Sequence, residues 1–287
     1  MSTKDTIMPL RGLANLLLFA LCTAAGFAHA AEQRVTIAPD VSGTWVTPDS
    51  NWDGRTVLML HGFADDMDGA GDLSKRMAGR LAQMGIATLR INFRGEGDRL
   101  RSNIESTLQS RIADTETAYA FLSKQPGVRA GHTAVLGWSL GATTALVVGG
   151  MHPAWFRSMV LWSTPSGEQF GPMSASPAAQ KALREGVASD IIPGWKTIVT
   201  KRAFYESFRG VDLDQSLARY PGALLTVRGS KDFLPQRDAQ LLNIAPGSNK
   251  EAALIGGADH VFNVFEPGSD APQRVLELSA AWLARSL

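Results

Sequence analysis

The sequence predicts an α/β fold, in which a mostly parallel sheet carries helices on both faces and a small cap is inserted late in the chain. Two observations lead to this prediction. Short apolar segments alternate with helical patterns along most of the chain, which is typical of a parallel sheet. One long stretch, from about 165 to 220, interrupts that alternation. The 287 residues are 45% hydrophobic and 19% charged, which suffices for one sizeable core.

The individual elements follow from the apolar pattern and from the turns between its segments. A strand is expected over 56–60, and an amphipathic helix over 73–84 ends at Gly85. The early segment 35–45 is expected to form antiparallel strands at the sheet edge. Further strands are expected over 86–92, 133–136, 158–162, 223–228 and 252–255, and further helices over 111–123, 142–148 and 273–285.

The first thirty residues differ in composition from the rest. Basic residues precede an apolar run over 13–27, and Ala28-His29-Ala30 ends it. This pattern predicts a signal peptide with cleavage after Ala30, and hence a periplasmic or secreted domain over 31–287. An uncleaved membrane anchor is the alternative, but the run is shorter than the about 20 apolar residues that a span needs. We therefore expect no stable membrane insertion after cleavage.

The stretch from 165 to 220 is expected to form a cap. It has weak periodicity and lies after the strand that ends at Trp162, on the side of the sheet where ligands bind in open α/β folds. Insertions of this length are usually functional or disordered. Its aromatic side chains either pack the cap onto the body or touch the substrate, and both can hold at once. They are Phe170, Trp195, Phe204, Tyr205 and Phe208.

The run 135–142, Val-Leu-Gly-Trp-Ser-Leu-Gly-Ala, places a serine between two glycines at a turn from strand to helix. This is the nucleophile-elbow pattern, in which the turn is too tight for side chains at the glycine positions. The five residues alone are a weak signal, because glycine and serine are common. The apolar strand before them and the small-residue helix after them supply the expected context. Ser139 is therefore the candidate nucleophile.

A serine hydroxyl needs a base to accept its proton and an acid to orient that base. Behind a nucleophile elbow the chain order is serine, acid, histidine. Asp232 follows the strand that ends at Arg228, and His260 follows the strand that ends at Ile255. Because the carboxyl ends of parallel strands share one edge of the sheet, we expect Ser139, Asp232 and His260 to meet there.

Other histidines and acids were weighed for the same roles. His61 follows a strand end but precedes the serine, and it is expected to support its loop. His132 lies in the turn before the strand over 133–136, and His152 lies beyond the elbow helix, beside Pro153. Asp259 adjoins His260, and neighbouring side chains rarely align for a hydrogen bond. Asp238 is the main alternative acid.

The second donor to an oxyanion is expected from the loop after an earlier strand. His61-Gly62-Phe63 follows the strand over 56–60, and Gly62 permits close approach of the backbone. The backbone N–H groups of Phe63 and Leu140 are therefore the candidate oxyanion hole. Each such donor stabilises a transition state by roughly 3 kcal/mol.

These motifs, together with Phe93-Arg-Gly-Glu-Gly-Asp98, resemble the α/β-hydrolase family over nearly the whole mature chain. The similarity is greatest to bacterial acyl esterases of the cinnamoyl and feruloyl esterase group. The resemblance implies an α/β-hydrolase fold, a triad of Ser139, Asp232 and His260, and oxyanion donors at Phe63 and Leu140. Arg99 and Trp138 depart from the usual pattern, which bears on the substrate and not on the chemistry.

The sequence thus predicts a serine hydrolase that cleaves small-molecule carboxylic esters through an acyl-enzyme, with no metal and no organic cofactor. The net charge of +1, without blocks of like charge, gives no indication of nucleic-acid binding. A peptidase or amidase on the same triad is the first alternative. A non-catalytic, ligand-binding hydrolase-like module is the second. The sequence makes no prediction of an oligomeric state.

Overall fold

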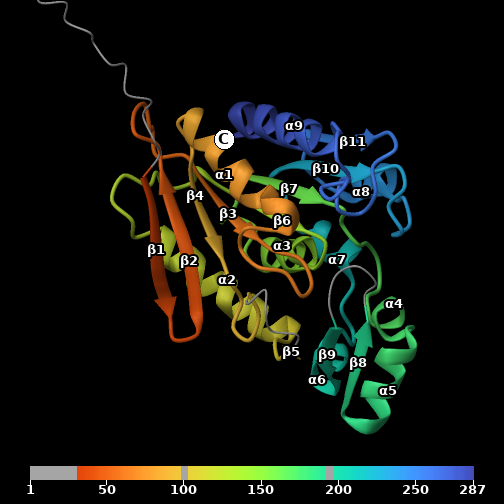
Figure 1. Ribbon diagram of the computed structural model, residues 1–287. Coiled ribbons are helices and arrows are strands. Elements are labelled where there is room, and N and C mark those ends of the chain that lie inside the picture. The colour runs from red at the N-terminus through yellow and green to blue at the C-terminus, as the bar shows by residue number, and fades with distance from the viewer. Residues whose placement is uncertain (1–30, 98–102, 192–196) are drawn as a thin grey trace, which may run out of the picture.

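The computed structural model describes residues 31–97, 103–191 and 197–287. Within these residues, eight strands form one sheet in the order β1-β2-β4-β3-β6-β7-β10-β11 (Figure 1). Strand β2 is antiparallel to β1 and β4, and all other pairs are parallel. The predicted α/β class is confirmed, including the antiparallel edge. The strands are β1 (Ala31–Ala38), β2 (Val41–Thr47), β3 (Thr56–Leu60), β4 (Ala87–Ile91), β6 (Thr133–Trp138), β7 (Ser158–Trp162), β10 (Ala223–Gly229) and β11 (Lys250–Ile255).

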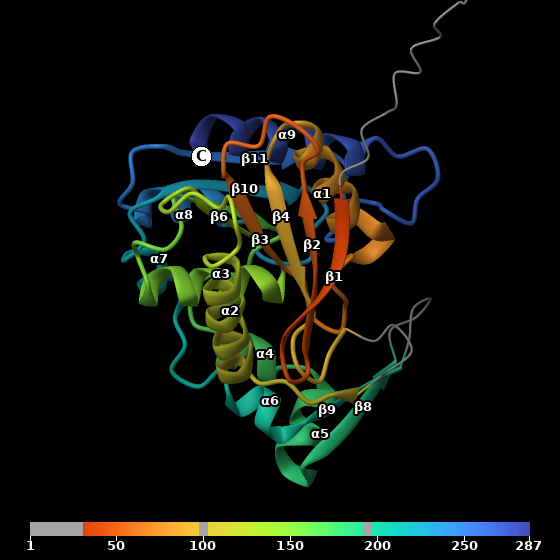
Figure 2. The same ribbon diagram turned by 90° about the vertical axis from the view of Figure 1, so that its left-hand side faces the viewer.

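Helices cover both faces of this sheet (Figures 1 and 2). One face packs against α1 and α9, which an ion pair between Arg80 and Glu277 also joins. The other face packs against α2, α3, α7 and α8. Each face buries its own apolar cluster, so the strands between them are apolar on both sides. These helices are α1 (Leu73–Gln83), α2 (Leu108–Leu122), α3 (Leu140–Met151), α7 (Leu213–Leu217), α8 (Asp238–Ile244) and α9 (Ala271–Ser286), and a short 3-10 turn, η1 (Ala70–Asp72), precedes α1.

Two element boundaries differ from the prediction in an informative way. Helix α2 begins at Leu108 rather than 111, because the Thr107 side chain accepts a hydrogen bond from Ser110 N and caps the helix. Strand β6 continues to Trp138, directly before the serine, rather than ending at 136. The elbow therefore follows the strand without an intervening loop.

The segment between β7 and α7 forms the cap-like part at the lower right of Figure 1. A second sheet in it has the order β5-β9-β8, and its strand β5 comes from the loop after β4. That contribution was not expected from the sequence. Helix α7, in contrast, lies on the body against α3. The cap elements are β5 (Asn103–Ile104), α4 (Phe170–Ser174), α5 (Pro177–Glu185), β8 (Val187–Ile191), β9 (Thr197–Lys201) and α6 (Arg202–Glu206).

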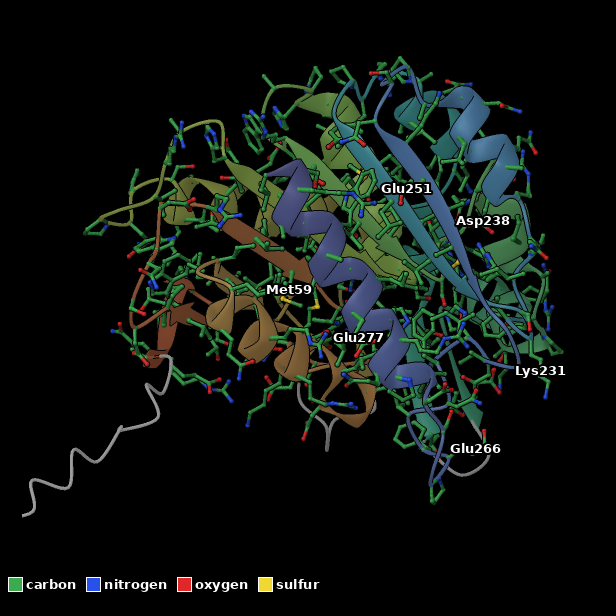
Figure 3. All side chains as sticks on the ribbon, turned by 90° about the horizontal axis from the view of Figure 1, so that it is seen from above. Met59, Lys231, Asp238, Glu251, Glu266 and Glu277 are labelled. Carbon is green, nitrogen blue, oxygen red and sulfur yellow. The ribbon has the colours of Figure 1, made fainter. Side chains whose placement is uncertain are left out.

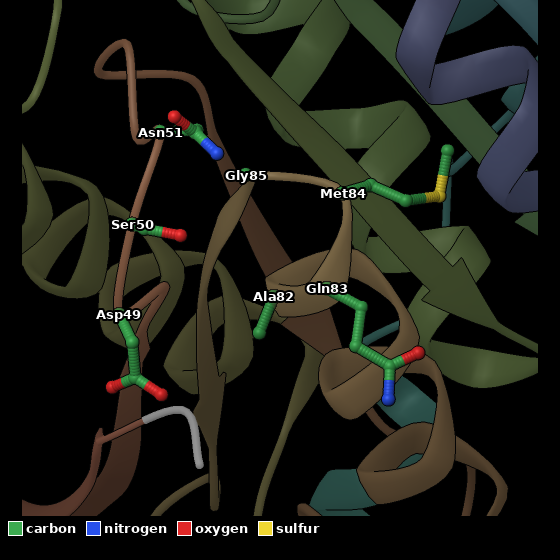
Figure 4. A pocket seen from close by; sticks show the side chains of 7 residues that line it. All are labelled: Asp49, Ser50, Asn51, Ala82, Gln83, Met84 and Gly85. Carbon is green, nitrogen blue, oxygen red and sulfur yellow. The ribbon is translucent and has the colours of Figure 1, made fainter. Parts of the chain in front are cut away.

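The predicted signal peptide over 1–30 and the aromatic residue Trp195 lie outside the described residues. Among the helices that the structure describes, none has the length and hydropathy of a membrane span. A cavity of about 420 Å³ lies between Asp49–Asn51 and the end of α1 at 82–85 (Figure 4). These residues precede β3 and β4, so the cavity is at the opposite end of the parallel strands from Ser139.

Candidate active site

Ser139 occupies a strained turn between β6 and α3. Its φ of 53° and ψ of −114° lie in a region that side-chain-bearing residues rarely adopt. A Cβ at position 137 would collide with Gly141 O, and one at position 141 would collide with Leu60 O, so both flanking positions require glycine. The Ser139 N–H donates to Trp162 O at 2.8 Å, which ties the turn to β7. The strain therefore presents the hydroxyl at the sheet edge.

The three predicted site residues meet at this edge. Ser139 Oγ lies 2.9 Å from His260 Nε2, and His260 Nδ1 lies 2.8 Å from Asp232 Oδ1. An ionised carboxylate only accepts hydrogen bonds, so Nδ1 carries the proton and donates to Asp232. Nε2 is then unprotonated and accepts the hydrogen bond of the Ser139 hydroxyl. The side chain of His260 is 14% exposed and that of Asp232 is 1% exposed, so the acid is shielded and the base reaches solvent.

The backbone of His260 is fixed by two donors to its carbonyl oxygen. Ser163 Oγ donates at 2.8 Å and Trp138 Nε1 at 3.3 Å. The Trp138 ring is buried and packs edge-on against Trp162, with Phe262 also in contact. The bulky Trp138 beside Ser139 thus supports the loop of His260, a role that sequence reasoning did not find.

Asp232 is held by a buried arginine that sequence reasoning also missed. Arg228 Nη1 donates to Asp232 Oδ2 at 3.1 Å, and Arg228 Nε donates to Asp238 Oδ2 at 3.0 Å. Arg228 Nη2 donates to Thr164 O. Asp238, the alternative acid, therefore pairs with the arginine, and His260 contacts Asp232. One signal was available in the sequence. Arg228 interrupts a mostly apolar strand four residues before Asp232, and a buried arginine needs a carboxylate partner in the protein interior.

The environment of Asp232 favours its ionised form. Burial alone raises the pKa of this carboxyl, but the hydrogen bond and charge of His260 act against burial. The N–H of Leu234 and the charge of Arg228 act in the same direction as His260. The pKa of Asp232 consequently lies below its ordinary value, and the carboxylate is available to orient the imidazole.

The loop with Gly62 and Phe63 lies against the elbow. A Cβ at position 62 would sit 3.6 Å from Ser139 Cβ and 3.4 Å from Trp138 O. Leu140 is the first residue of α3, where backbone N–H groups are free of helical partners. The structure thus brings the two predicted oxyanion donors, Phe63 and Leu140, to the surroundings of the serine.

A second buried arginine, Arg111 of α2, holds this loop. Its Nη2 donates to His61 O at 2.6 Å and its Nε to Thr144 Oγ1 at 3.3 Å, so it joins the loop to α3. Glu96 pairs with Arg111 Nη1, and both side chains are fully buried. The guanidinium also lies 3.7 Å from the centre of the Phe93 ring, a cation–π contact.

His61 supports the loop as a neutral ring. Its Nδ1 lies 2.8 Å from Gly62 O and donates to it, and its Nε2 accepts the N–H of Phe93 at 3.3 Å. Burial is the main cause that lowers the pKa of His61 to about 4, and the charge of Arg111 adds to it while Glu96 opposes it. Protonation would remove the acceptor that Phe93 uses, so the loop depends on the neutral form.

The other residues that were weighed take structural roles. His152 stacks on Trp155 and its Nε2 lies 2.8 Å from Glu116 Oε1. Asp259 accepts the N–H groups of Val261 and Asn263 and does not orient the imidazole. Among the described residues, no three His, Cys, Asp or Glu side chains gather as metal ligands would.

The cap reaches the site through one apolar cluster. The Phe63 ring lies 5.2 Å from that of Phe204 on α6, and Leu140 belongs to the same buried cluster. Phe208 and Tyr205 complete the aromatic part of this cluster. These cap aromatics therefore pack against the body, beside both predicted oxyanion donors.

Comparison of the sequence with known protein families assigns the chain to one of them. The family described as serine aminopeptidase, S33, matches residues 54–212, which is more than half of the chain. The chain belongs to this family of α/β-hydrolases. The matched part contains Ser139 and the loop with Phe63, whereas Asp232 and His260 lie beyond it. No curated protein matches the sequence.

Solved structures share the fold over most of their length. Est1E from Butyrivibrio proteoclasticus with bound ferulic acid is 13% identical, with a TM-score of 0.71 over 88% of this chain and 98% of its own. The esterase domain of a Rhodothermus marinus protein is 19% identical, with a TM-score of 0.63 over 89% and 98%. Dienelactone hydrolase from Anabaena variabilis is 18% identical, with a TM-score of 0.57 over 90% and 99%. At these identities the likeness shows the α/β-hydrolase fold.

Proposed function

We propose that the protein hydrolyses small-molecule carboxylic esters with Ser139 as nucleophile, His260 as general base and acid, and Asp232 as the group that orients the imidazole. The observation that carries this proposal is the continuous hydrogen-bonded series from Ser139 Oγ through His260 to Asp232, at 2.9 and 2.8 Å. Such distances lie within the range that proton transfer between these groups requires.

The acylation step follows from this arrangement. Ser139 Oγ forms a bond to the acyl carbon while its proton passes to His260 Nε2. The carbonyl oxygen becomes an oxyanion, which the N–H groups of Phe63 and Leu140 stabilise at the N-terminus of α3. The bond to the alkoxy oxygen then breaks, and the proton on Nε2 moves to that oxygen. An alcohol leaves and Ser139 remains acylated.

Deacylation repeats the same steps with water. His260 Nε2 takes a proton from water as its oxygen attacks the acyl carbon, and the second tetrahedral intermediate uses the same two N–H donors. Its collapse returns the proton to Ser139 Oγ and releases the carboxylic acid. The chemistry balances with ester and water alone, and in both halves of the reaction His260 Nε2 takes up the proton and passes it on.

A fluorophosphonate probe together with p-nitrophenyl esters tests the proposal. We expect the wild-type protein to be labelled and to hydrolyse the esters, and Ser139→Ala to lose labelling and at least about 10⁴-fold of kcat. Equal labelling of both proteins would remove Ser139 from the mechanism. If the wild type is neither labelled nor hydrolyses the esters, but a ligand raises its melting temperature, the non-catalytic module would be favoured.

Cleavage of amides is the second candidate, because the matching family is described as serine aminopeptidase. Acids that could hold a peptide amino terminus follow the oxyanion loop at 65, 66 and 68. Asp65 accepts the N–H of Ala70, and Asp68 pairs with Arg90 at 3.1 Å. These engagements support the ester proposal. Faster turnover of aminoacyl anilides than of p-nitrophenyl esters would reverse the order of the two candidates.

We also propose that the protein is exported and that cleavage after Ala30 releases it. The support is the basic start, the apolar run and the small residues at 28 and 30. The test is N-terminal sequencing of the protein from the cell fractions of a Gram-negative bacterium that expresses the full chain. We expect periplasmic or secreted protein that begins at Ala31, and a retained Met1 in the membrane fraction would indicate an anchor.

A further inference from the structure

Phe233 is the most exposed large hydrophobic side chain among the described residues, at 77%, and it lies beside the proposed base. Its ring centre is 4.3 Å from that of His260, with 36° between the ring planes. Phe262, in the same loop as His260, is by contrast fully buried. Phe233 thus offers one face to the imidazole and leaves most of its surface open to an incoming molecule.

The turn that carries Phe233 is fixed on both sides. Asp232 N donates to Gly229 O, and Asp232 Oδ1 accepts the N–H of Leu234 at 2.9 Å. The preceding Lys231 N–H donates to Ala258 O, which joins this turn to the loop of His260. Lys231 and Glu266 mark these two loops at one end of the molecule in Figure 3. The ring therefore stands in a defined place relative to the imidazole.

The reaction geometry decides which part of a substrate passes this ring. In the tetrahedral intermediate, the oxyanion points to the N–H groups of Phe63 and Leu140, and His260 Nε2 has to reach the departing oxygen. The group attached to that oxygen consequently leaves alongside the imidazole. The acyl chain occupies the remaining direction, away from His260.

We propose that the Phe233 ring forms a leaving-group subsite, which binds the alcohol portion of the ester and favours apolar or aromatic alcohols. The inference rests on the proposed ester hydrolysis and adds which part of the ester the enzyme recognises. An exposed aromatic ring is large and rigid, so an apolar group can bury surface against it while the side chain loses little conformational freedom. Contact with a bulky alcohol adds to kcat/KM, whereas the acyl-enzyme no longer carries the alcohol and does not sense this ring.

The experiment compares ethyl, n-butyl and 2-phenylethyl esters of one carboxylic acid, whose alcohols leave with similar ease but differ in apolar size. For Phe233→Ala we expect kcat/KM to fall about tenfold for the 2-phenylethyl ester and to stay nearly unchanged for the ethyl ester. For the 2-phenylethyl ester, the kcat/KM of Phe233→Leu should lie between those of the wild type and Phe233→Ala. Lengthening the acyl chain of the ethyl esters should leave the ratio of wild type to Phe233→Ala constant.

Phe265→Ala is the matched control, because Phe265 is also exposed, at 68%, and lies in the loop after His260. It should retain the wild-type preference among the alcohols. An equal loss for all three alcohols in Phe233→Ala would overturn the subsite and assign the ring to support of His260. No loss, or the same selective loss in Phe265→Ala, would overturn it as well. Absence of Ser139-dependent ester cleavage in the wild type would instead contradict the proposed function.

Discussion

Two buried arginines flank Ser139, and they hold the two sides of the site in different ways. On the acid side, Arg228 lies between two carboxylates, Asp232 and Asp238. On the oxyanion side, Arg111 pairs with one carboxylate, Glu96, and donates to the backbone carbonyl of the loop. Arg228 thus contacts the carboxylate that accepts the hydrogen bond of the imidazole, whereas Arg111 contacts neither Asp232 nor His260 in any of these interactions and holds the loop of His61 against α3.

This difference separates electrostatic from geometric support. The charge of Arg228 is one of the causes that keep the pKa of Asp232 low, so it acts on the charge of the carboxylate that contacts the imidazole. Arg111 acts on the position of the backbone at His61, two residues before the proposed oxyanion donor Phe63. Changes on the acid side should therefore move the pH dependence of activity, and changes on the oxyanion side should lower kcat without moving it.

The largest effect is expected from Arg228→Met. It leaves two carboxylates without their shared cation in the interior, which should cost about 5 kcal/mol of unfolding free energy. In the folded molecules kcat/KM should fall by about 100-fold, since a small displacement of Asp232 misplaces the imidazole. Denaturant unfolding and ester kinetics at several pH values measure both. The acid limb of the kcat/KM profile should move to higher pH, because a positive charge that helps to keep the pKa of Asp232 low is gone.

Arg90→Met is the matched control for that variant. Arg90 is also buried and pairs with two carboxylates, Glu32 and Asp68, but it lies at the antiparallel edge of the sheet. It should lower the unfolding free energy while the pH profile of the folded enzyme stays unchanged. A shift of the acid limb in Arg90→Met as large as in Arg228→Met would make the effect of Arg228 nonspecific.

A smaller loss of stability, about 3 kcal/mol, is expected from Arg111→Met, because one carboxylate rather than two is left unpaired. Adding Glu96→Gln removes that charge and should restore much of the unfolding free energy. The double variant should still have a reduced kcat, since His61 O has lost its donor and the loop is released. If the double variant recovers full kcat with an unshifted pH profile, Arg111 has no part in positioning the loop.

The sequence indicated the residues of the proposed triad but not the residues that hold them in place. Ser139, Asp232 and His260 follow strand ends in a recognisable order, and the folded chain brings them within hydrogen-bonding distance. Arg228 and Arg111 were missed because charged side chains are almost never fully buried, and the pattern does not show which ones are paired inside.

The cap shows the same limit on the scale of the fold. Its sheet includes β5, two residues that pair with β9 more than ninety positions later in the chain. So short a strand leaves no periodic signal, and its pairing is a property of the folded chain. The central strands of the main sheet, β3, β4, β6, β7 and β10, were predictable because each is a local, mostly apolar run.

Acid unfolding tests whether the oxyanion side depends on a neutral ring. The pKa of His61 in the folded protein is about 4, against 6.5 for an unperturbed ring. The unfolded chain binds the extra proton between these values, so the contribution of His61 is complete above pH 6.5 and is lost as the pH falls to about 4. This loss amounts to about 3 kcal/mol. The measurement is the unfolding free energy of wild type and His61→Gln against pH.

We expect a shallower slope for His61→Gln in the upper part of that window. Glutamine carries an amide that can donate to Gly62 O and accept from Phe93 N without titrating. The carboxylates Asp232 and Glu96 have lowered pKa values. They therefore add to the unfolding free energy at pH values above their ordinary pKa, and this contribution is lost at more acidic pH. Identical slopes in the two proteins above pH 4.5, the ordinary value of a glutamate, would show that His61 does not titrate with unfolding.

The smallest effect is expected from Asp238→Asn, and this variant best separates electrostatic support by Arg228 from packing support. The amide keeps a hydrogen bond to Arg228 but removes one of its two counter-charges, so the arginine acts more strongly on Asp232 and through it on His260. The pKa of Asp232 should then fall further, and the loss of kcat/KM at acidic pH should begin at a lower pH. This is opposite in direction to Arg228→Met. A structural perturbation alone lowers activity in both variants but has no reason to displace their profiles in opposite directions, so shifts of the same sign would reduce Arg228 to a packing role.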